Sequence, residues 1–420
     1  MSEKMPISTR VKLSAMMFLQ FMMFAVFWAQ LAPYITSSGW DSMKFWMLST
    51  MPLGAIASPL IGMVADRFFN SEKVLAFSNV VCGIMLFMAG RAAVTSTNGV
   101  DVFIYLLIAM IFYMPSWGLT AAIAMSNSPA EQFPQIRVFG SIGWVSSVLF
   151  SIVGLKVFGK NIDGTNIPFY CGAAASIAAA AVALMLPKTP PPAKGQKMSA
   201  VDALGLKAFS LMKEKNFAVF ILVSFVAMVP FNIHFAFLGD FLKAKGFELV
   251  TFTAYIGQAA EMILMLLVTV CMRKFGVKWS IIAGLVALVI RYVAYYLGAG
   301  DMVAAIYLGI LVHGIIFGFF VVGGQIYVGK VAPAEMQAQA QGFYGLVTFG
   351  LGSLLGTFVN NTMINHYTSP VSKVVEEKTV TVLQGSWDKV WLVSTAISVV
   401  LLVVMVIFFN PKCDKEPKEA

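Results

Sequence analysis

The sequence predicts an all-α integral membrane protein with twelve transmembrane helices in two six-helix bundles and both termini in the cytoplasm. Three observations lead to this fold class. The 420 residues are 59% hydrophobic and 12% charged, whereas an ordinary soluble domain carries about 25% charged residues. The apolar residues gather in runs of about 20, the length that crosses a bilayer as a helix. Most Lys and Arg residues fall in alternate short loops, as the positive-inside rule predicts.

Twelve apolar runs are candidate spans, six on each side of a basic, proline-containing segment. Their approximate bounds are 11–35, 43–64, 73–94, 101–125, 138–158, 167–186, 217–240, 251–272, 279–298, 302–328, 337–364 and 388–409. The longest outer loop is expected at 367–387.

The segment over residues 188–216 separates the two sets of spans. Its proline run cannot continue a helix, and it is rich in Lys. We therefore expect an N-terminal bundle over 1–187, a cytoplasmic linker over 188–216 and a C-terminal bundle over 217–420. A short amphipathic helix is expected in the linker near Leu204–Lys215.

Composition also excludes several classes of function. The net charge of +9 is spread over loops between apolar runs, which argues against nucleic-acid binding. The four Cys form no CxxC pair and the three His are scattered, so we expect no metal site and no disulfide framework. The chain contains neither a Walker loop nor an HExxH motif, so we expect no enzyme activity and no cofactor.

Glu261 lies inside the run over residues 251–272. A carboxylate at membrane depth costs several kcal/mol unless it is paired, hydrated or protonated, so it marks a functional site. Gln258 lies one turn earlier on the same helical face. An amide and a carboxylate suit the hydroxyl and N–H groups of a polar solute. The alternative for Gln258 is a structural bond between helices.

Arg137, Ser141 and Trp144 share one helical face through their i, i+4, i+7 spacing. Arg offers a rigid fork of donors, and Trp offers a flat surface for a ring. The alternative is an Arg that reaches the cytoplasmic surface and a Trp that anchors the interface.

His313 and Phe317 lie four residues apart on one face of the run over residues 302–328. His can carry a proton at physiological pH. The alternative is a hydrogen-bonded structural His.

The loop after the second span contains Gly62, Asp66 and Arg67 as GMVADR, which resembles the G-x-x-x-D-R signature of the major facilitator superfamily. The segment over residues 273–278 repeats it in part after the eighth span. Within that superfamily the chain resembles the nucleoside:proton symporter family of bacterial permeases. The matching pieces run from the first span to the last: FLQF (18–21), GMVAD (62–66), FPQIRVFGSIGW (133–144), LGLKAF (204–209), GQAAE (257–261), IRYVAYYLGAGD (290–301), HGIIFGFF (313–320), QAQG (339–342) and WDKVW (387–391).

The resemblance implies substrate-binding roles for nine residues and a conformational role for Gly62, Asp66 and Arg67. The nine are Arg137, Ser141, Trp144, Asn232, Phe235, Gln258, Glu261, His313 and Phe317. The pattern around Arg137 and Trp144 also resembles lactose-permease-type sugar porters, so it does not separate nucleosides from glycosides.

The chain departs from the family pattern at Gly318, where the family has an acidic residue implicated in proton coupling. Either Glu261 or His313 takes that role, or the protein is an uncoupled facilitator. Arg291 matches a basic family position and either neutralises Glu261 or meets the outer headgroups. His234 is expected to be a packing or lipid-boundary residue.

The patterns predict a secondary transporter that works by alternating access with its site between the bundles near the midplane, and the resemblance implies that it imports nucleosides coupled to protons. Transport of sugars or glycosides is the alternative, and a non-transporting receptor is the competing class. The expected partners are a nucleoside or sugar, protons and the lipid bilayer, without nucleic acid. We expect a monomer in the bacterial inner membrane.

Overall fold

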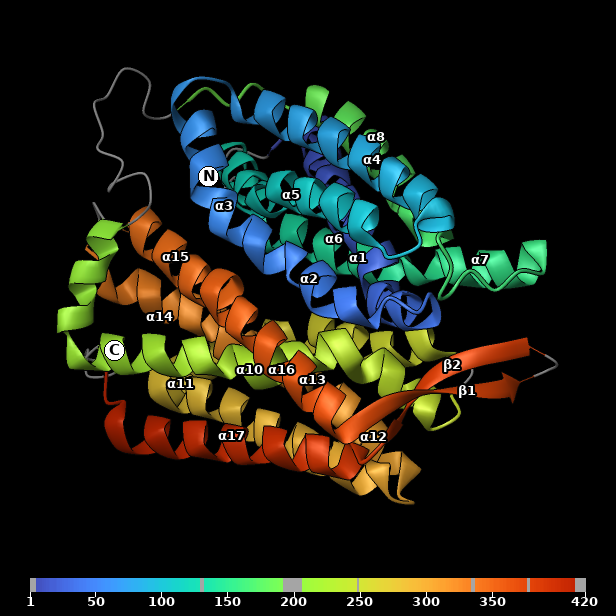
Figure 1. Cartoon of the computed structure of the whole chain (residues 1–420). Helices are drawn as coiled ribbons and strands as arrows, with labels where there is room; N and C mark the ends of the chain where they lie inside the picture. The colour runs from blue at the N-terminus through green and yellow to red at the C-terminus, as the bar shows by residue number, and fades with distance from the viewer. Residues whose placement is uncertain are drawn as a thin grey trace. The chain divides into compact units, whose positions relative to one another are not determined.

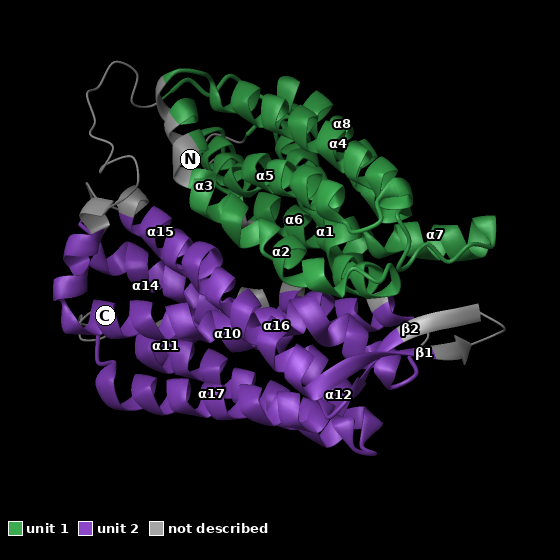
Figure 2. Ribbon diagram, viewed as in Figure 1, with its two compact units in different colours: residues 1–199 green, residues 200–420 purple. Residues whose placement is uncertain are grey.

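The computed structural model describes residues 5–128, 132–191, 206–247, 249–333, 337–375 and 378–411. These residues are overwhelmingly helical (Figure 1). The chain divides into two compact units, residues 1–199 and 200–420 (Figure 2).

The helices of unit 1 fall on the six predicted spans of the first half. Its elements are α1 (Ile7–Ser37), η1 (Asp41–Met43), α2 (Lys44–Leu48), α3 (Thr50–Arg67), α4 (Ser71–Thr95), α5 (Val100–Ser126), α6 (Phe133–Ser146), α7 (Val148–Phe158) and α8 (Ile167–Leu184). Helix α1 packs on α6 and α8, and α4 packs between α5 and α8.

Unit 2 is built from longer and more interrupted helices. Its elements are η3 (Leu206–Lys213), α10 (Lys215–Ala244), α11 (Val250–Ala299), α12 (Val303–Leu311), α13 (His313–Ile315), η4 (Ile316–Val322), α14 (Gly323–Val331), α15 (Gln337–Gly345), η6 (Leu346–Gly352), α16 (Ser353–Tyr367), β1 (Thr368–Val375), β2 (Lys378–Gly385) and α17 (Trp387–Phe408). Helix α11 packs against α12, α13, η4 and α17, while α10 packs on α16 and α17.

Ten helical stretches of the described chain are long and apolar enough to cross a membrane. The two other predicted spans, 43–64 and 251–272, fall on α2–α3 and on the first part of α11, where several side chains lie outside the described residues. Large apolar side chains such as Leu222, Ile263 and Val400 are more than half exposed. An outward-facing apolar surface of this kind fits contact with lipid rather than water.

A buried polar network ties four helices of unit 1 together. Gln20 of α1 donates to Ser116 of α5 at 2.5 Å and accepts from Asn79 of α4 at 3.0 Å. Tyr113 donates to the Gln20 backbone carbonyl at 2.9 Å, and Ser176 of α8 donates to the Asn79 carbonyl at 2.8 Å. Polar side chains that bond between helices are a common means of association in membranes.

The structure corrects the expected loop between the eighth and ninth spans. Helix α11 runs from Val250 to Ala299 with a break only at Gly276, where φ is 82° and ψ is 171°. Glycine adopts this positive φ without the steric cost that a Cβ would bring. The chain therefore turns at a single residue instead of through a six-residue loop.

Two further features were not predicted from the sequence, and one predicted helix has a different type. The expected outer loop over 367–387 contains the antiparallel hairpin β1–β2, with Thr368 paired to Gly385 and Val375 to Lys378. The expected amphipathic helix of the linker is the 3-10 helix η3. Two spans contain π-helical segments, η4 and η6, which often occur at functional sites.

Candidate functional site

Glu261 has the partner that its burial demands. Glu261 lies on α11 and is 8% exposed, and its Oε2 lies 3.3 Å from Nε2 of His313 on α13. His313 is 1% exposed. The sequence placed both residues in the site, and the structure brings them together.

Small residues allow α11 to meet α12 and α13 closely near this pair. A Cβ on Gly314 would lie 2.6 Å from the Cα of Glu261, and one on Gly257 would lie 2.6 Å from the Ile310 carbonyl oxygen. Side chains larger than hydrogen would push the helices apart at these two points. The glycines therefore set the distance between Glu261 and His313.

Arg291 completes a chain of three charged or titratable side chains. It is fully buried, and its NH2 lies 2.8 Å from Nδ1 of His313. Its Nε donates to the Gly309 carbonyl oxygen at 3.2 Å. Of the two expected roles for Arg291, contact with outer headgroups is therefore wrong. His313 lies between the Arg291 guanidinium and the Glu261 carboxylate and contacts both.

Aromatic rings enclose His313. Phe235 of α10 lies edge-on to it with ring centroids 5.2 Å apart, and Phe317 of η4 lies at 6.2 Å. Phe231, which the sequence did not single out, contacts both Phe235 and Phe317 at 5.3 and 6.4 Å. These rings form an apolar surface beside Glu261, His313 and Arg291.

His234 belongs to the same cluster, so of its two expected places the packing one holds and the lipid boundary is wrong. It is 2% exposed, and its ring stacks on His313 with centroids 5.2 Å apart. Its Nδ1 lies 2.9 Å from the hydroxyl oxygen of Tyr295 on α11. A signal was present in the sequence, because Phe231, His234 and Phe235 follow the i, i+3, i+4 spacing of one helical face.

Gln258 and Asn232 have different surroundings. Gln258 is 7% exposed, and its Oε1 has no hydrogen-bond partner among the described residues. A buried unpaired carbonyl costs about 1–3 kcal/mol, so it is suited to accept from a ligand. Asn232 is half-buried and points its amide toward the Ser353 carbonyl oxygen at 3.4 Å.

Gly318 lies in the π-helical segment η4 and is buried. Its position therefore offers no titratable group to the cluster. Among the described residues around His313, the acidic group is Glu261.

In unit 1, α6 carries the predicted face of Arg137, Ser141 and Trp144. The guanidinium carbon of Arg137 lies 4.4 Å from the centre of the Phe21 ring, within the range of a cation–π interaction. All three residues are partly exposed.

Trp144 packs against an aromatic cluster centred on Phe24. Its ring lies 5.6 Å from Phe24, which in turn stacks on Tyr113 and Trp28 at 4.9 and 5.0 Å. The Nε1 of Trp144 has no hydrogen-bond partner among the described residues. Close packing of α6 on α1 fixes this arrangement, because a Cβ on Gly143 would collide with the Phe18 carbonyl.

The motif residues Gly62, Asp66 and Arg67 lie at the C-terminal end of α3. Their side chains fall outside the described part of the structure. Their expected conformational role is therefore still a prediction.

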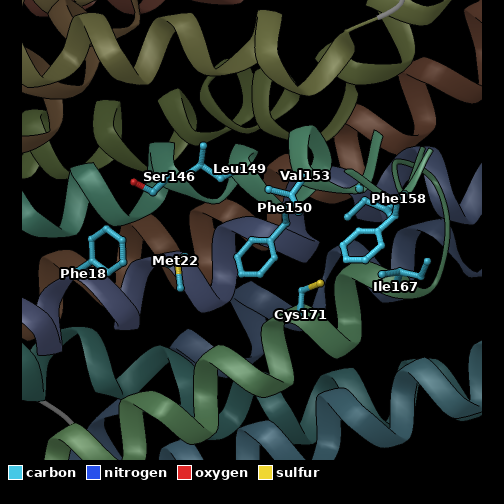
Figure 3. A pocket seen from close by; sticks show the side chains of 11 residues that line it. Phe18, Met22, Ser146, Leu149, Phe150, Val153, Phe158, Ile167 and Cys171 are labelled. Carbon is cyan, nitrogen blue, oxygen red and sulfur yellow. The ribbon is translucent and has the colours of Figure 1, made fainter. Parts of the chain in front are cut away.

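A pocket of about 370 Å³ in unit 1 lies elsewhere (Figure 3). Residues of α1, α6, α7 and α8 line it, among them the rings of Phe18, Phe150 and Phe158. Its lining is almost wholly apolar and contains none of the nine predicted binding residues. It lacks the donors and acceptors that a nucleoside would need.

Comparisons with known proteins agree with one another over nearly the whole chain. A model of the family described as "Nucleoside H+ symporter" matches residues 7–414. The Escherichia coli K12 protein named "Putative nucleoside transporter YegT" is 33% identical over 413 residues, 96% of this chain and 94% of the relative. The nucleoside permease NupG of the same organism is 26% identical, with 97% of each chain covered.

Solved structures show the same relationship. The crystal structure of the nucleoside transporter NupG superposes with a TM-score of 0.77 at 26% identity, covering 96% of this chain and all of the other. An aspartate-to-alanine variant of NupG gives a TM-score of 0.82 at 25% identity, with the same coverage. A D-xylose–proton symporter gives a TM-score of 0.71 at 13% identity, which shows a shared fold only.

Proposed function

This chain belongs to the nucleoside H⁺ symporter family, and we propose that its two side-chain clusters carry out the binding and coupling steps of nucleoside import. Membership makes the protein a multi-pass membrane transporter and not an enzyme. Its function is the import of nucleosides by a secondary active, proton-coupled mechanism.

In unit 1 the nucleoside-binding residues are Arg137, Ser141 and Trp144. The half-buried guanidinium over Phe21 offers planar donors for hydroxyl or carbonyl oxygens. Trp144, backed by Phe24, offers a ring face and an unpaired N–H. An aromatic face beside hydrogen-bond donors suits a base attached to a ribose.

In unit 2 the binding residues are Asn232, Phe235, Gln258, Glu261, His313 and Phe317. The unpaired amide oxygen of Gln258 and the carboxylate of Glu261 accept hydrogen bonds from hydroxyl or N–H groups. Phe235 and Phe317 contribute ring surface beside His313.

Proton coupling is assigned to the Glu261–His313 pair. The single observation that carries this assignment is the buried 3.3 Å contact between the two side chains, held by Arg291. Buried carboxylate and imidazole groups in membrane proteins are the usual parts of proton relays. The pair takes the role that Gly318 cannot fill.

The finer architecture is part of the same proposal. It comprises twelve transmembrane helices with both termini in the cytoplasm of a bacterium, in bundles over 1–187 and 217–420 joined by the linker 188–216. Gly62, Asp66 and Arg67 act in the conformational change. The protein works as a monomer in the inner membrane, surrounded by lipid and without nucleic-acid partners.

The test is uptake of labelled uridine into proteoliposomes, with and without an inward proton gradient, and in competition with adenosine and with simple sugars. Accumulation above equilibrium only under the gradient, reduced by adenosine, is the expected result. Equilibration without accumulation would remove the coupling assignment. Competition by sugars alone would remove the assigned substrate class.

A further inference from the structure

Arg291 restricts the protonation of His313. A guanidinium carries N–H donors and no acceptor, so the Nδ1 that lies 2.8 Å from Arg291 NH2 must present its lone pair. The neutral ring then carries its proton on the other nitrogen. The bond from Arg291 Nε to the Gly309 carbonyl oxygen holds the guanidinium in this orientation.

The other nitrogen of His313 faces the carboxylate. Nε2 lies 3.3 Å from Oε2 of Glu261, so its N–H points at an acceptor. In this tautomer both ring nitrogens have complementary partners. An imidazolium would instead set an N–H against the N–H of Arg291 and place two positive charges side by side in a fully buried site, which is costly.

The groups packed around His313 are consistent with a neutral ring. The titratable groups that face it among the described residues are Glu261 and Arg291 from α11 and His234 from α10. The hydroxyl oxygen of Tyr295 lies 2.9 Å from Nδ1 of His234. With His313 neutral, the positive charge of Arg291 and the negative charge of Glu261 balance through one intervening ring.

We infer that Arg291 is a positioning residue that fixes the neutral, Nε2-protonated tautomer of His313, so that Glu261 and not His313 takes up the transported proton. This inference rests on the proposed proton-coupled function. A proton from outside binds the Glu261 carboxylate and makes the carboxylic acid. His313 keeps its single proton and continues to donate from Nε2 to a carboxyl oxygen, and the same carboxyl later releases the proton to the cytoplasm.

The tautomer is directly measurable because the 420-residue sequence contains three His. In the protein labelled with ¹⁵N-histidine and reconstituted in lipid nanodiscs, the substitutions His234→Asn and His366→Asn assign the signals. We expect His313 to show an unprotonated Nδ1 and a protonated Nε2 throughout the pH range in which uridine uptake titrates. A doubly protonated His313 within that range would overturn the inference.

Substitutions at Arg291 separate positioning from simple structural support. Arg291→Lys keeps a donor against Nδ1 and should preserve the tautomer and gradient-driven accumulation. Arg291→Met removes the donor, so His313 should gain a titration and the pH profile of uptake should shift with it. Identical His313 spectra in the wild type and Arg291→Met would show that Arg291 does not set the tautomer.

His313→Gln covers the case in which Arg291→Met does not fold. A glutamine amide offers an oxygen to Arg291 and an N–H to Glu261, but it cannot carry a proton. We expect slower uptake that still accumulates uridine above equilibrium under a gradient. Loss of accumulation while uridine counterflow persists would identify His313 as the carrier. Absence of uridine flux in the wild type would refute the proposed function, and the NMR result would still decide the tautomer.

Discussion

Arg137 in unit 1 and Arg291 in unit 2 are the same residue type placed in two different environments. Arg137 is partly exposed on α6 and lies over the ring of Phe21. Arg291 is fully buried on α11, where it contacts a histidine and a backbone carbonyl. The first guanidinium still presents surface to a ligand, whereas two of the nitrogens of the second are engaged in fixing neighbouring groups.

We infer from this difference that the two clusters have different roles. Unit 1 offers aromatic faces and donors, which recognise a solute but do not change charge. Unit 2 contains a carboxylate whose charge is balanced by a buried chain of partners. Substitutions in unit 1 should therefore change the apparent affinity for nucleoside, and those at Glu261 should change coupling.

Glu261→Gln should have the largest effect, because an amide cannot take up a proton. We expect gradient-driven accumulation of uridine to fall to the equilibrium level, while counterflow of uridine across the same vesicles persists. Asp301→Asn is the matched control, since Asp301 is an exposed acid of the same unit. Full accumulation by Glu261→Gln would end the assignment of this carboxyl as the carrier.

Arg137→Lys should lower kcat/KM for uridine roughly tenfold to a hundredfold. Lys keeps the charge but loses the planar fork, and hydrogen bonds to charged groups contribute about 1.5–3 kcal/mol. The proton dependence of the remaining uptake should be unchanged. Initial uptake rates at several pH values measure both quantities, with Arg91→Lys as an exposed control in unit 1. A shifted pH profile in Arg137→Lys would contradict the assignment of binding to the unit 1 cluster and of coupling to the unit 2 cluster.

Gly314→Ala should destabilise the protein by about 1–3 kcal/mol, the usual cost of overpacking. The added Cβ would lie 2.6 Å from the Cα of Glu261 and force α11 and α13 apart. Gly345→Ala is the matched control, because a Cβ there meets nothing within 4 Å. Thermal unfolding in detergent compares the two variants. Equal melting temperatures would mean that the helices do not meet as closely as described.

Trp144→Leu should have the smallest effect, roughly a two- to tenfold rise in KM. An aromatic pair contributes about 0.5–1.5 kcal/mol beyond the area it buries, and leucine keeps much of the packing against Phe24. The uptake of uridine at increasing concentration gives the KM. An unchanged KM would remove Trp144 from the binding residues.

Sequence reasoning located the charged group of unit 2 but not its environment. The cost of burying Glu261 predicts a partner, and helical spacing places Gln258 on its face. The partners, however, come from positions 30 and 52 residues further along the chain, Arg291 and His313. Spacing within one helix says which residues share a face, but not which faces of different helices meet.

The same limit explains the other differences. The sequence predicts a packing or lipid-boundary position for His234, whereas the face that meets His313 contains Phe231, His234 and Phe235. The break at Gly276 and the π-helical segments depend on backbone conformations that apolar periodicity does not encode. The long apolar runs were predicted well, because helical length and hydropathy are local properties.

The most direct test of the account is uridine-driven proton movement, followed with a pH-sensitive dye inside proteoliposomes that have no imposed gradient. The account predicts that external uridine acidifies the lumen of vesicles with the wild-type protein. Vesicles with Glu261→Gln should show no acidification although labelled uridine still enters. Equal acidification by the wild type and Glu261→Gln would contradict the assignment of Glu261 as the proton carrier.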